Sequence, residues 1–338
     1  MSNECLNVGL IGVGRIGKLH AEHLAYRLPG VRLKTIADVN AGAAQACATR
    51  LGVPVVSSDY HAILEDRDIQ AVVICSPTNT HAQIVVEAAG AGKHIFCEKP
   101  IDLALDRVDQ ALAAVGQAGV RLQLGFNRRF DANFARVRRA IASGEVGTLR
   151  FVHIVSRDPA PPPIEYVKVS GGIFMDMTIH DFDMARFLVG DEVEEVYVSG
   201  GVMVDPAIGE VGDIDTALTV LRFRSGVIGT IDNCRQAVYG YDQRVEAFGS
   251  KGSIQTDNNY ANSAIIASGQ SVGRDLPLNF FMERYTESFL AEMRAFVDAV
   301  LNGKPVPVTG EDARKAMLIG LAARRSYETK RPEHVFSK

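Results

Sequence analysis

The chain has 338 residues, of which 47% are hydrophobic, and its formal net charge is −4. This length exceeds what one hydrophobic core usually supports, so we expect two domains of a folded protein. The net negative charge excludes the global positive field that draws a protein to nucleic acid or anionic lipid, so neither partner is expected.

The five cysteines are scattered and never form a C-x-x-C pair, which argues against a disulfide framework and against a structural zinc site. The N-terminal sequence MSNECLNVGLIG runs directly into a strand pattern, and no apolar segment is long enough to span a bilayer. We therefore expect a cytoplasmic protein with no metal site, no export signal and no membrane anchor.

Residues 1–125 alternate short apolar runs with helical stretches, from NVGLIGVG through AVVICSP to RLQLGF. Strands this uniformly apolar, separated by helices, are typical of a parallel sheet that is covered on both faces. The pattern predicts an α/β fold class, with a doubly wound Rossmann sheet in this N-terminal domain.

Within that domain, residues 12–17 follow an apolar strand, open a helix and form a G-x-G-x-x-G pattern. Gly12 permits a tight turn, Gly14 lets a pyrophosphate approach the backbone, and Gly17 allows the helix to pack closely on the strand. Because a helix N-terminus offers free N–H groups and a positive dipole end, we expect a dinucleotide to bind here, against Arg15 and Ile16 as well.

Asp38 lies at the end of the second predicted strand, where its carboxylate can accept hydrogen bonds from the adenosine ribose hydroxyls. A carboxylate repels a 2′-phosphate, so the sequence favours NAD over NADP, although the guanidinium of Arg15 leaves NADP open as a second cofactor. Two further strand ends should face the same crevice, because ligands of open parallel sheets collect at the carboxyl ends of strands. They contribute these candidate cofactor residues: Ser76, Thr78, Asn79, His81, Glu98 and Lys99.

From residue 126 the pattern changes to alternating strands and turn signals such as Arg224-Ser225-Gly226, with long helices expected near Glu283 and after Thr309. Residues 126–338 are therefore predicted to form an α+β domain with a mainly antiparallel open sheet, whose C-terminal helix could pack back on the first domain. The basic runs are interpreted as solvated helix faces; they are Arg128-Arg129, residues 136–139 and Arg324-Arg325.

Residues 171–190, GGIFMDMTIHDFDMARFLVG, have the composition of a buried helix, yet they contain four ionisable side chains. On one continuous helix Asp176, His180 and Asp183 would share a stripe, while Asp181 would point elsewhere. A carboxylate one turn before an imidazole can fix its tautomer and stabilise its protonated form, as a catalytic base requires. A satisfied structural cluster and a two-ligand metal site are the alternatives, but no further histidine motif completes a metal site.

The sequence resembles the Gfo/Idh/MocA oxidoreductases, and within them the inositol 2-dehydrogenases. The likeness covers nearly the whole chain and rests on GLIGVGRIGKLHAEHL, the CEKP turn, GFNRRFD and, above all, GGIFMDMTIHDFDMARFL. It implies that Lys99, Asp176 and His180 are catalytic, and that the second domain binds substrate and mediates oligomerisation, often as a homotetramer. It also implies that these further residues lie near a polyol ring: Asn127, Arg157, Asp158, Asp183, Tyr239 and Tyr285.

The activity implied by the resemblance is NAD-dependent oxidation of one secondary alcohol of a ring polyol, with myo-inositol giving 2-keto-myo-inositol (scyllo-inosose) as the first expectation. His180 would remove the hydroxyl proton, Asp176 would orient His180, and Lys99 would stabilise the developing alkoxide. A scyllo-inositol or aldopyranose substrate keeps the same chemistry. A non-catalytic NAD-binding sugar sensor and a glycoside hydrolase that retains its NAD are alternatives of other classes.

Overall fold

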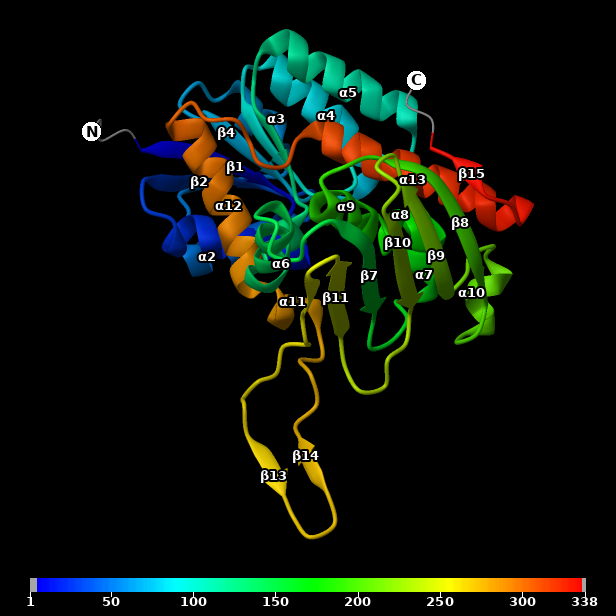
Figure 1. The fold of residues 1–338 in the computed structure, drawn as a ribbon. Coiled ribbons are helices and arrows are strands. Elements are labelled where there is room, and N and C mark those ends of the chain that lie inside the picture. Colours follow the sequence, from blue (N-terminus) through cyan, green and yellow to red (C-terminus); the bar gives the residue numbers. More distant parts are fainter. Residues whose placement is uncertain (1–4, 336–338) are drawn as a thin grey trace. The chain divides into compact units, whose positions relative to one another are not determined.

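The computed structural model describes residues 5–335, and the chain divides into two compact units (Figure 1). The first unit comprises residues 1–127 and Phe289–Arg314, and the second comprises Arg128–Ser288 and 315–338. The predicted division at residue 125 had left Phe289–Arg314 in the second domain, whereas the structure groups this segment with the first unit. Residues 1–4, on which the expectation of no export signal partly rests, lie outside the described part of the chain.

The first unit is built on a six-stranded parallel sheet in the order β3-β2-β1-β4-β5-β6. The central strand β4, Ala71–Ile74, is apolar throughout and fully buried, as expected when helices cover both faces. This confirms the predicted doubly wound sheet. Its strands are β1 Leu6–Ile11, β2 Val31–Ala37, β3 Val55–Ser57, β4 Ala71–Ile74, β5 His94–Cys97 and β6 Leu122–Leu124.

Helices follow the strands of this sheet in alternation, and part of a late helix joins them. Leu290, Met293, Phe296 and Val297 of α12 belong to the same apolar core as β1, β2 and α2, which explains why this segment groups with the first unit. The helices concerned are α1 Arg15–Glu22, η1 His23–Arg27, α2 Ala41–Leu51, α3 His61–Glu65, α4 Thr78–Gly90, α5 Leu105–Ala118 and α12 Thr286–Leu301.

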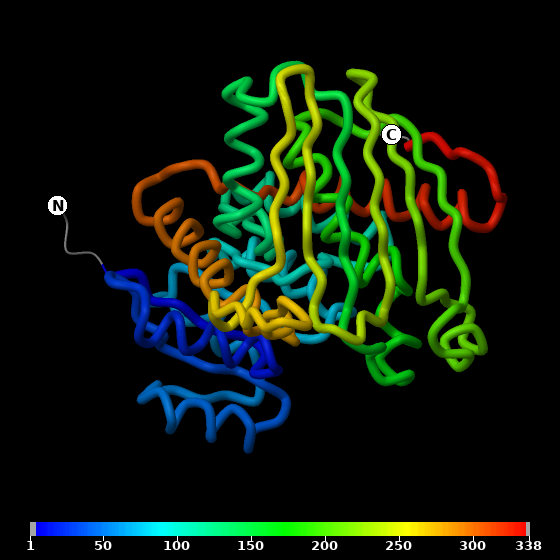
Figure 2. The backbone as a smooth tube through the Cα atoms, turned by 60° about the horizontal axis from the view of Figure 1, so that its bottom comes forward, coloured from blue at the N-terminus to red at the C-terminus, as the bar shows by residue number. Residues whose placement is uncertain are grey.

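The second unit contains a seven-stranded sheet in the order β12-β11-β7-β10-β9-β8-β15, in which only β7 and β10 pair in parallel. The mainly antiparallel open sheet is therefore confirmed, and its strands run side by side in Figure 2. The predicted turn at Arg224-Ser225-Gly226 joins β9 to β10. The strands are β7 Leu149–Arg157, β8 Val193–Gly201, β9 Thr216–Phe223, β10 Ile228–Cys234, β11 Asp242–Gly249, β12 Gly252–Gln255 and β15 Glu333–His334.

A separate two-stranded hairpin, β13 Ile265–Ala267 and β14 Val272–Arg274, projects from this unit (Figure 1). The remaining elements are η2 Asn127–Phe130, α6 Ala132–Ala142, α7 Ile164–Ser170, α8 Ile173–Asp176, α9 Ile179–Val189, α10 Pro206–Glu210, α11 Phe281–Arg284 and α13 Gly310–Thr329. The acidic helix start after Thr309 is confirmed, because Thr309 and Asp312 exchange capping hydrogen bonds at the start of α13.

The continuous helix predicted over residues 171–190 is wrong, because the segment forms two helices, α8 and α9. The amides of Met177 and Thr178 both donate to the carbonyl of Ile173, which shifts the hydrogen-bond ladder by one residue. The Thr178 hydroxyl donates to Asn233 Oδ1 (2.8 Å) at the same point. Asp176 therefore ends one helix, while His180 and Asp183 lie on the next.

In the described part of the chain, no helix combines the length and the apolar character that crossing a bilayer requires.

Candidate active site

The glycine loop between β1 and α1 has the shape that its sequence predicts. Gly12 has φ +94°, and a Cβ there would meet the backbone of Cys75 and Ser76 at 2.6 Å, so only glycine fits. A Cβ on Gly17 would lie 2.0 Å from the carbonyl oxygen of Gly12, so the close contact between helix and strand requires glycine at this position. Gly14, in contrast, has no neighbour within 4 Å of its added Cβ and is exposed at the start of α1.

Asp38 follows β2 and is tied to the same loop. Its carboxylate accepts hydrogen bonds from the backbone amides of Val13 (2.7 Å) and Asn40 (2.8 Å), which fixes its position beside the glycine turn. Each carboxylate oxygen has a second lone pair, so both can still accept from ribose hydroxyls. The next residue, Val39, is 93% exposed and carries no charge that could balance a 2′-phosphate, whereas Arg15 is exposed within the loop.

His81 supports two strand-end turns instead of facing solvent. Its Nε2 lies 2.7 Å from the carbonyl oxygen of Ser76, and its Nδ1 lies 2.8 Å from the carbonyl oxygen of Pro100. His81 is 2% exposed, so we expect it to affect cofactor binding by holding these two turns in place. Thr78 opens α4, and the Ser76 and Thr80 hydroxyls form a hydrogen bond of 2.7 Å at the end of β4.

These features of the first unit fit a dinucleotide. Gly14 leaves space for a pyrophosphate at the N-terminus of α1, and Asp38 presents its carboxylate at the end of the neighbouring strand. Glu98 and Lys99 follow β5, and Asn127 is buried after β6, at the carboxyl ends of adjacent parallel strands.

In the second unit, Asp176 is held from two sides at the end of α8. One carboxylate oxygen accepts from the Tyr166 hydroxyl (2.8 Å), and the other lies 3.2 Å from Nη1 of the buried Arg235. Gly172, just before α8, has φ +80°, and a Cβ there would lie 2.8 Å from a carboxylate oxygen of Asp213, so this position favours glycine.

A buried ion pair lies next to this segment and was not predicted. Nη1 of Arg128 donates to Asp181 (2.5 Å), and Nδ2 of Asn233 donates to the other carboxylate oxygen (2.9 Å). The Tyr285 ring lies 5.8 Å from the Arg128 guanidinium. Burial raises the pKa of Asp181, while Arg128 lowers it. The interpretation of Arg128 as part of a solvated helix face is therefore wrong, since it is 5% exposed.

Asp183 also forms an ion pair with an arginine. Arg129 contacts both of its carboxylate oxygens, with Nε donating over 2.8 Å and Nη2 over 2.5 Å. Asp183 is 1% exposed. Arg129 is therefore not a solvated surface charge either, and the likeness-based assignment of Asp183 to the polyol ring stays a prediction.

Asp158, directly after β7, has a perturbed pKa. Burial raises the pKa of this carboxyl to about 6, Arg235 and Arg128 oppose the rise, and Asp176 and Asp181 add to it. Asp158 thus lies within the electrostatic reach of both arginines that hold the acidic residues of α8 and α9. A carboxyl that titrates near neutral pH beside such a cluster is a candidate for binding or proton chemistry.

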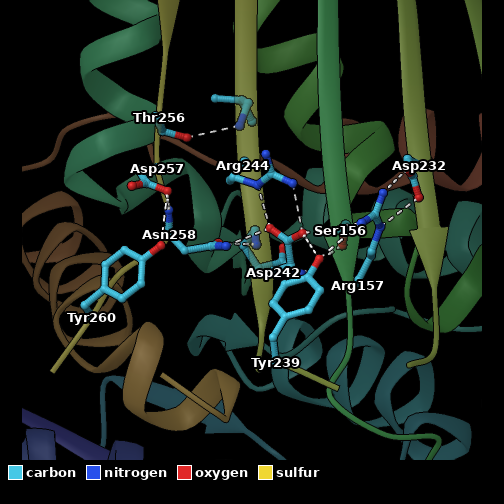
Figure 3. A network of polar contacts seen from close by, with 12 residues as sticks. Ser156, Arg157, Asp232, Tyr239, Asp242, Arg244, Thr256, Asp257, Asn258 and Tyr260 are labelled. Carbon is cyan, nitrogen blue, oxygen red and sulfur yellow. Dashed lines mark hydrogen bonds and ion pairs between the residues drawn. The ribbon is translucent and has the colours of Figure 1, made fainter. Parts of the chain in front are cut away.

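Arg157 and Tyr239 belong to a different network, shown in Figure 3. Arg157 pairs with Asp232, and its side chain lies on the opposite face of the sheet from that of Ser156, because successive strand residues point to opposite faces. The Tyr239 hydroxyl donates to Asp242 (2.5 Å), and Arg157 Nη1 donates to the Tyr239 oxygen (3.1 Å). Ser156, on the other face, accepts a hydrogen bond from Nε2 of Gln243 (3.1 Å), and the Tyr285 hydroxyl donates to Oε1 of the same side chain.

Within the second unit, the structure thus brings together Asp158, Asp176 and Tyr285 with residues that sequence reasoning missed, namely Arg128, Tyr166, Asp181, Asn233, Arg235 and Gln243. It separates Arg157 and Tyr239 from them. The sequence does hold one signal that points to Arg128 and Arg129. An apolar segment with several acidic residues, such as residues 176–183, needs buried cations from elsewhere in the chain.

Comparison with known proteins gives matches to both units. Residues 6–126 match an oxidoreductase family with an NAD-binding Rossmann fold, and residues 134–255 match the GFO/IDH/MocA C-terminal domain. The chain is 48% identical to a myo-inositol 2-dehydrogenase of Thermotoga maritima over 96% of this chain and 97% of the relative. It is 46% identical to an inositol 2-dehydrogenase of Rhizobium meliloti, with the same two coverages.

Among solved structures, the chain resembles a scyllo-inositol dehydrogenase from Lactobacillus casei with bound cofactor NAD(H) and scyllo-inositol. The TM-score is 0.92 at 29% identity, over 99% of this chain and 100% of that one. The likeness extends over both units of the chain.

Proposed function

The chain belongs to the Gfo/Idh/MocA family of oxidoreductases, and on this premise we propose that it oxidises a secondary alcohol of a ring polyol, converting myo-inositol to 2-keto-myo-inositol with NAD. The observation that carries the proposal is that the chain is 46–48% identical to two inositol 2-dehydrogenases over 96% of its length. The glycine loop, Asp38 and the acid-rich segment of α8 and α9 support it, because they supply a dinucleotide site and a carboxylate–imidazole segment.

In the proposed reaction, His180 takes the proton of the reacting hydroxyl, and Lys99 stabilises the negative charge that develops on that oxygen. Asp176 favours the protonated imidazole by its charge, while Tyr166 and Arg235 hold its carboxylate in place. Bound NAD would supply the hydride acceptor. Asp158 and Tyr285 are proposed to line the polyol site, together with Asn127 and Asp183.

NAD is proposed as the main cofactor and NADP as a secondary one. Asp38 repels a 2′-phosphate, and the exposed Val39 offers that phosphate no positive charge. Arg15 is exposed in the loop and is the residue through which weaker use of NADP would occur.

The test is formation of NADH, followed by its absorbance, from the purified protein with myo-inositol, scyllo-inositol, chiro-inositol, glucose and xylose. We expect the highest kcat/KM for myo-inositol with NAD. No reduction with any polyol, despite tight nucleotide binding, would contradict the proposal and favour a sugar sensor or an NAD-retaining glycoside hydrolase. The hydrolase would then cleave a chromogenic glycoside without net NADH.

Scyllo-inositol is the second candidate substrate, because the Lactobacillus casei relative was crystallised with it. The two inositols differ in the orientation of one hydroxyl, so the same residues can serve either. A higher kcat/KM for scyllo-inositol would change the substrate and leave the chemistry intact. The cytoplasmic location and the homotetramer expected from the sequence stay predictions.

A further inference from the structure

Three ionisable side chains meet inside the first unit, in a place that the proposed reaction does not use. His20 of α1, Glu98 after β5 and Glu292 of α12 form what we call the buried triad. Nε2 of His20 lies 2.8 Å from Oε1 of Glu98 and 3.9 Å from Oε1 of Glu292. The side chains of His20 and Glu292 have no exposed surface, and that of Glu98 is 13% exposed.

The surroundings of the triad are apolar. The rings of Phe96 and Phe289 meet the His20 ring edge to face at centroid distances of 5.2 and 5.9 Å. Among the described residues, neither carboxylate oxygen of Glu292 has a hydrogen-bond partner, and neither does Nδ1 of His20. One imidazole can balance at most one carboxylate, so two ionised glutamates would leave a net negative charge in a buried site.

Three titratable groups that interact electrostatically with the triad supply no positive charge. Burial lowers the pKa of His23 to about 4, with help from His20 and Arg27, so this imidazole is neutral at pH 7. Burial raises the pKa of the Cys75 and Cys97 thiols, which keeps them uncharged. Burial, and then the charge of Glu98, also raise the pKa of Glu292 well above its usual range.

The triad is connected to Lys99 through the turn that follows β5. His20 holds the Glu98 side chain, while His81 holds the carbonyl oxygen of Pro100 at 2.8 Å, so the residues on both sides of Lys99 are fixed by buried imidazoles. On its other side, the Glu98 carboxylate packs closely against Gly125: a Cβ added to this glycine would lie 2.8 Å from Glu98 Oε2. Glu98 therefore has little room to move. A change at His20 or Glu292 would therefore move this turn.

We propose that Glu292 is kept as a neutral carboxylic acid beside the His20–Glu98 pair, and that these three residues position the turn that carries Lys99. The positioning role rests on the proposed function, whereas the protonation of Glu292 does not. His20, Glu98 and Glu292 are positioning residues, since they act on the substrate only through the turn.

A divalent cation is the competing way to neutralise the triad. One ligand atom from each residue lies within 4.8 Å of the other two, and this is the only such group of three among residues 5–335. A histidine with two carboxylates is a possible zinc ligand set. The proposal requires a proton in that place, so elemental analysis of protein purified without added metal should find less than stoichiometric cation.

Infrared spectroscopy tests the proton directly. The wild-type protein at pH 7 should show the C=O stretch of a protonated carboxylic acid, and Glu292→Gln should lose this band. Glu65→Gln, the same change at an exposed position of the first unit, should keep it. Absence of the band from the wild type, or a stoichiometric cation, would overturn the proposal, and neither readout depends on the substrate.

The positioning role has its own test in two variants of His20. His20→Leu removes the donor to Glu98 and should lower kcat about 10- to 100-fold through displacement of Lys99, while the Kd for NAD changes less than about threefold. His20→Gln keeps an N–H near the position of Nε2 and should recover most of that loss. Equal kcat in both variants would overturn the positioning role. If His20→Leu does not fold, the same comparison is made with Glu98→Leu and Glu98→Gln.

Discussion

His180 is the side chain on which the proposed chemistry depends most. It lies in the first turn of α9, after the break that separates it from Asp176. His180→Ala should lower kcat by ~10² to 10⁴, which is the range of general acid–base catalysis, and the Kd for NAD should stay within about threefold. Steady-state kinetics and nucleotide fluorescence measure the two effects. Near-normal turnover in His180→Ala would refute its role as base.

Asp158 predicts a pH dependence of stability. Burial raises its pKa to about 6 in the folded chain, so the folded state holds a proton that the unfolded state has lost. The stability from this proton is complete below about pH 4 and is lost as the pH rises to about 6. Asp158→Asn should remove this dependence. The difference in free energy of unfolding between Asp158→Asn and the wild type should therefore shift by about 1–3 kcal/mol in favour of the variant as the pH rises from 4.5 to 7.

Urea unfolding at several pH values measures this difference. Asp275→Asn is the matched control, since Asp275 is exposed in the same unit. A constant difference between Asp158→Asn and the wild type across this range would contradict a raised pKa at Asp158.

At the scale of elements, two glycines of the β1–α1 loop are expected to have different roles, one in cofactor binding and the other in folding. Gly14→Ala adds a methyl group where the protein leaves open space and where φ is −61°, so the melting temperature should change little. The same methyl group would occupy the place of the pyrophosphate, and the Kd for NAD should rise about tenfold or more. Gly17→Ala should instead lower the melting temperature, because its Cβ would overlap the carbonyl oxygen of Gly12. Equal effects of the two variants on folding would contradict this division of roles.

The sequence predicted this loop well because every requirement in it is local. The acid-rich segment was predicted less well, because its structure depends on residues far away in the chain. Thr178 bonds Asn233, and Asp181 pairs with Arg128, which lies more than fifty residues earlier. Periodicity showed an apolar helix, but it carries no information on such partners. For the same reason, the sequence around Arg128 does not show that this residue is buried.

At the scale of the whole molecule, the seven-stranded sheet carries several apolar side chains on a face that the second unit leaves exposed. Strand register places Phe248, Phe151 and Ile228 side by side on it, and Tyr197 opposite Val220 in the next row. Phe248 and Ile228 are 45% and 47% exposed. An exposed apolar surface of this kind indicates an interface, and we expect it to join copies of the chain in the predicted tetramer.

Ile228→Glu should therefore weaken self-association, because the interface would have to bury a carboxylate beside Phe151. Light scattering after gel filtration should give a lower mass for this variant than for the wild type. Val272→Glu is the matched control, since Val272 is exposed on the β13–β14 hairpin, away from this face. The same mass for wild type and Ile228→Glu would exclude this face as the interface, whereas a lower mass in Val272→Glu alone would assign the contact to the hairpin.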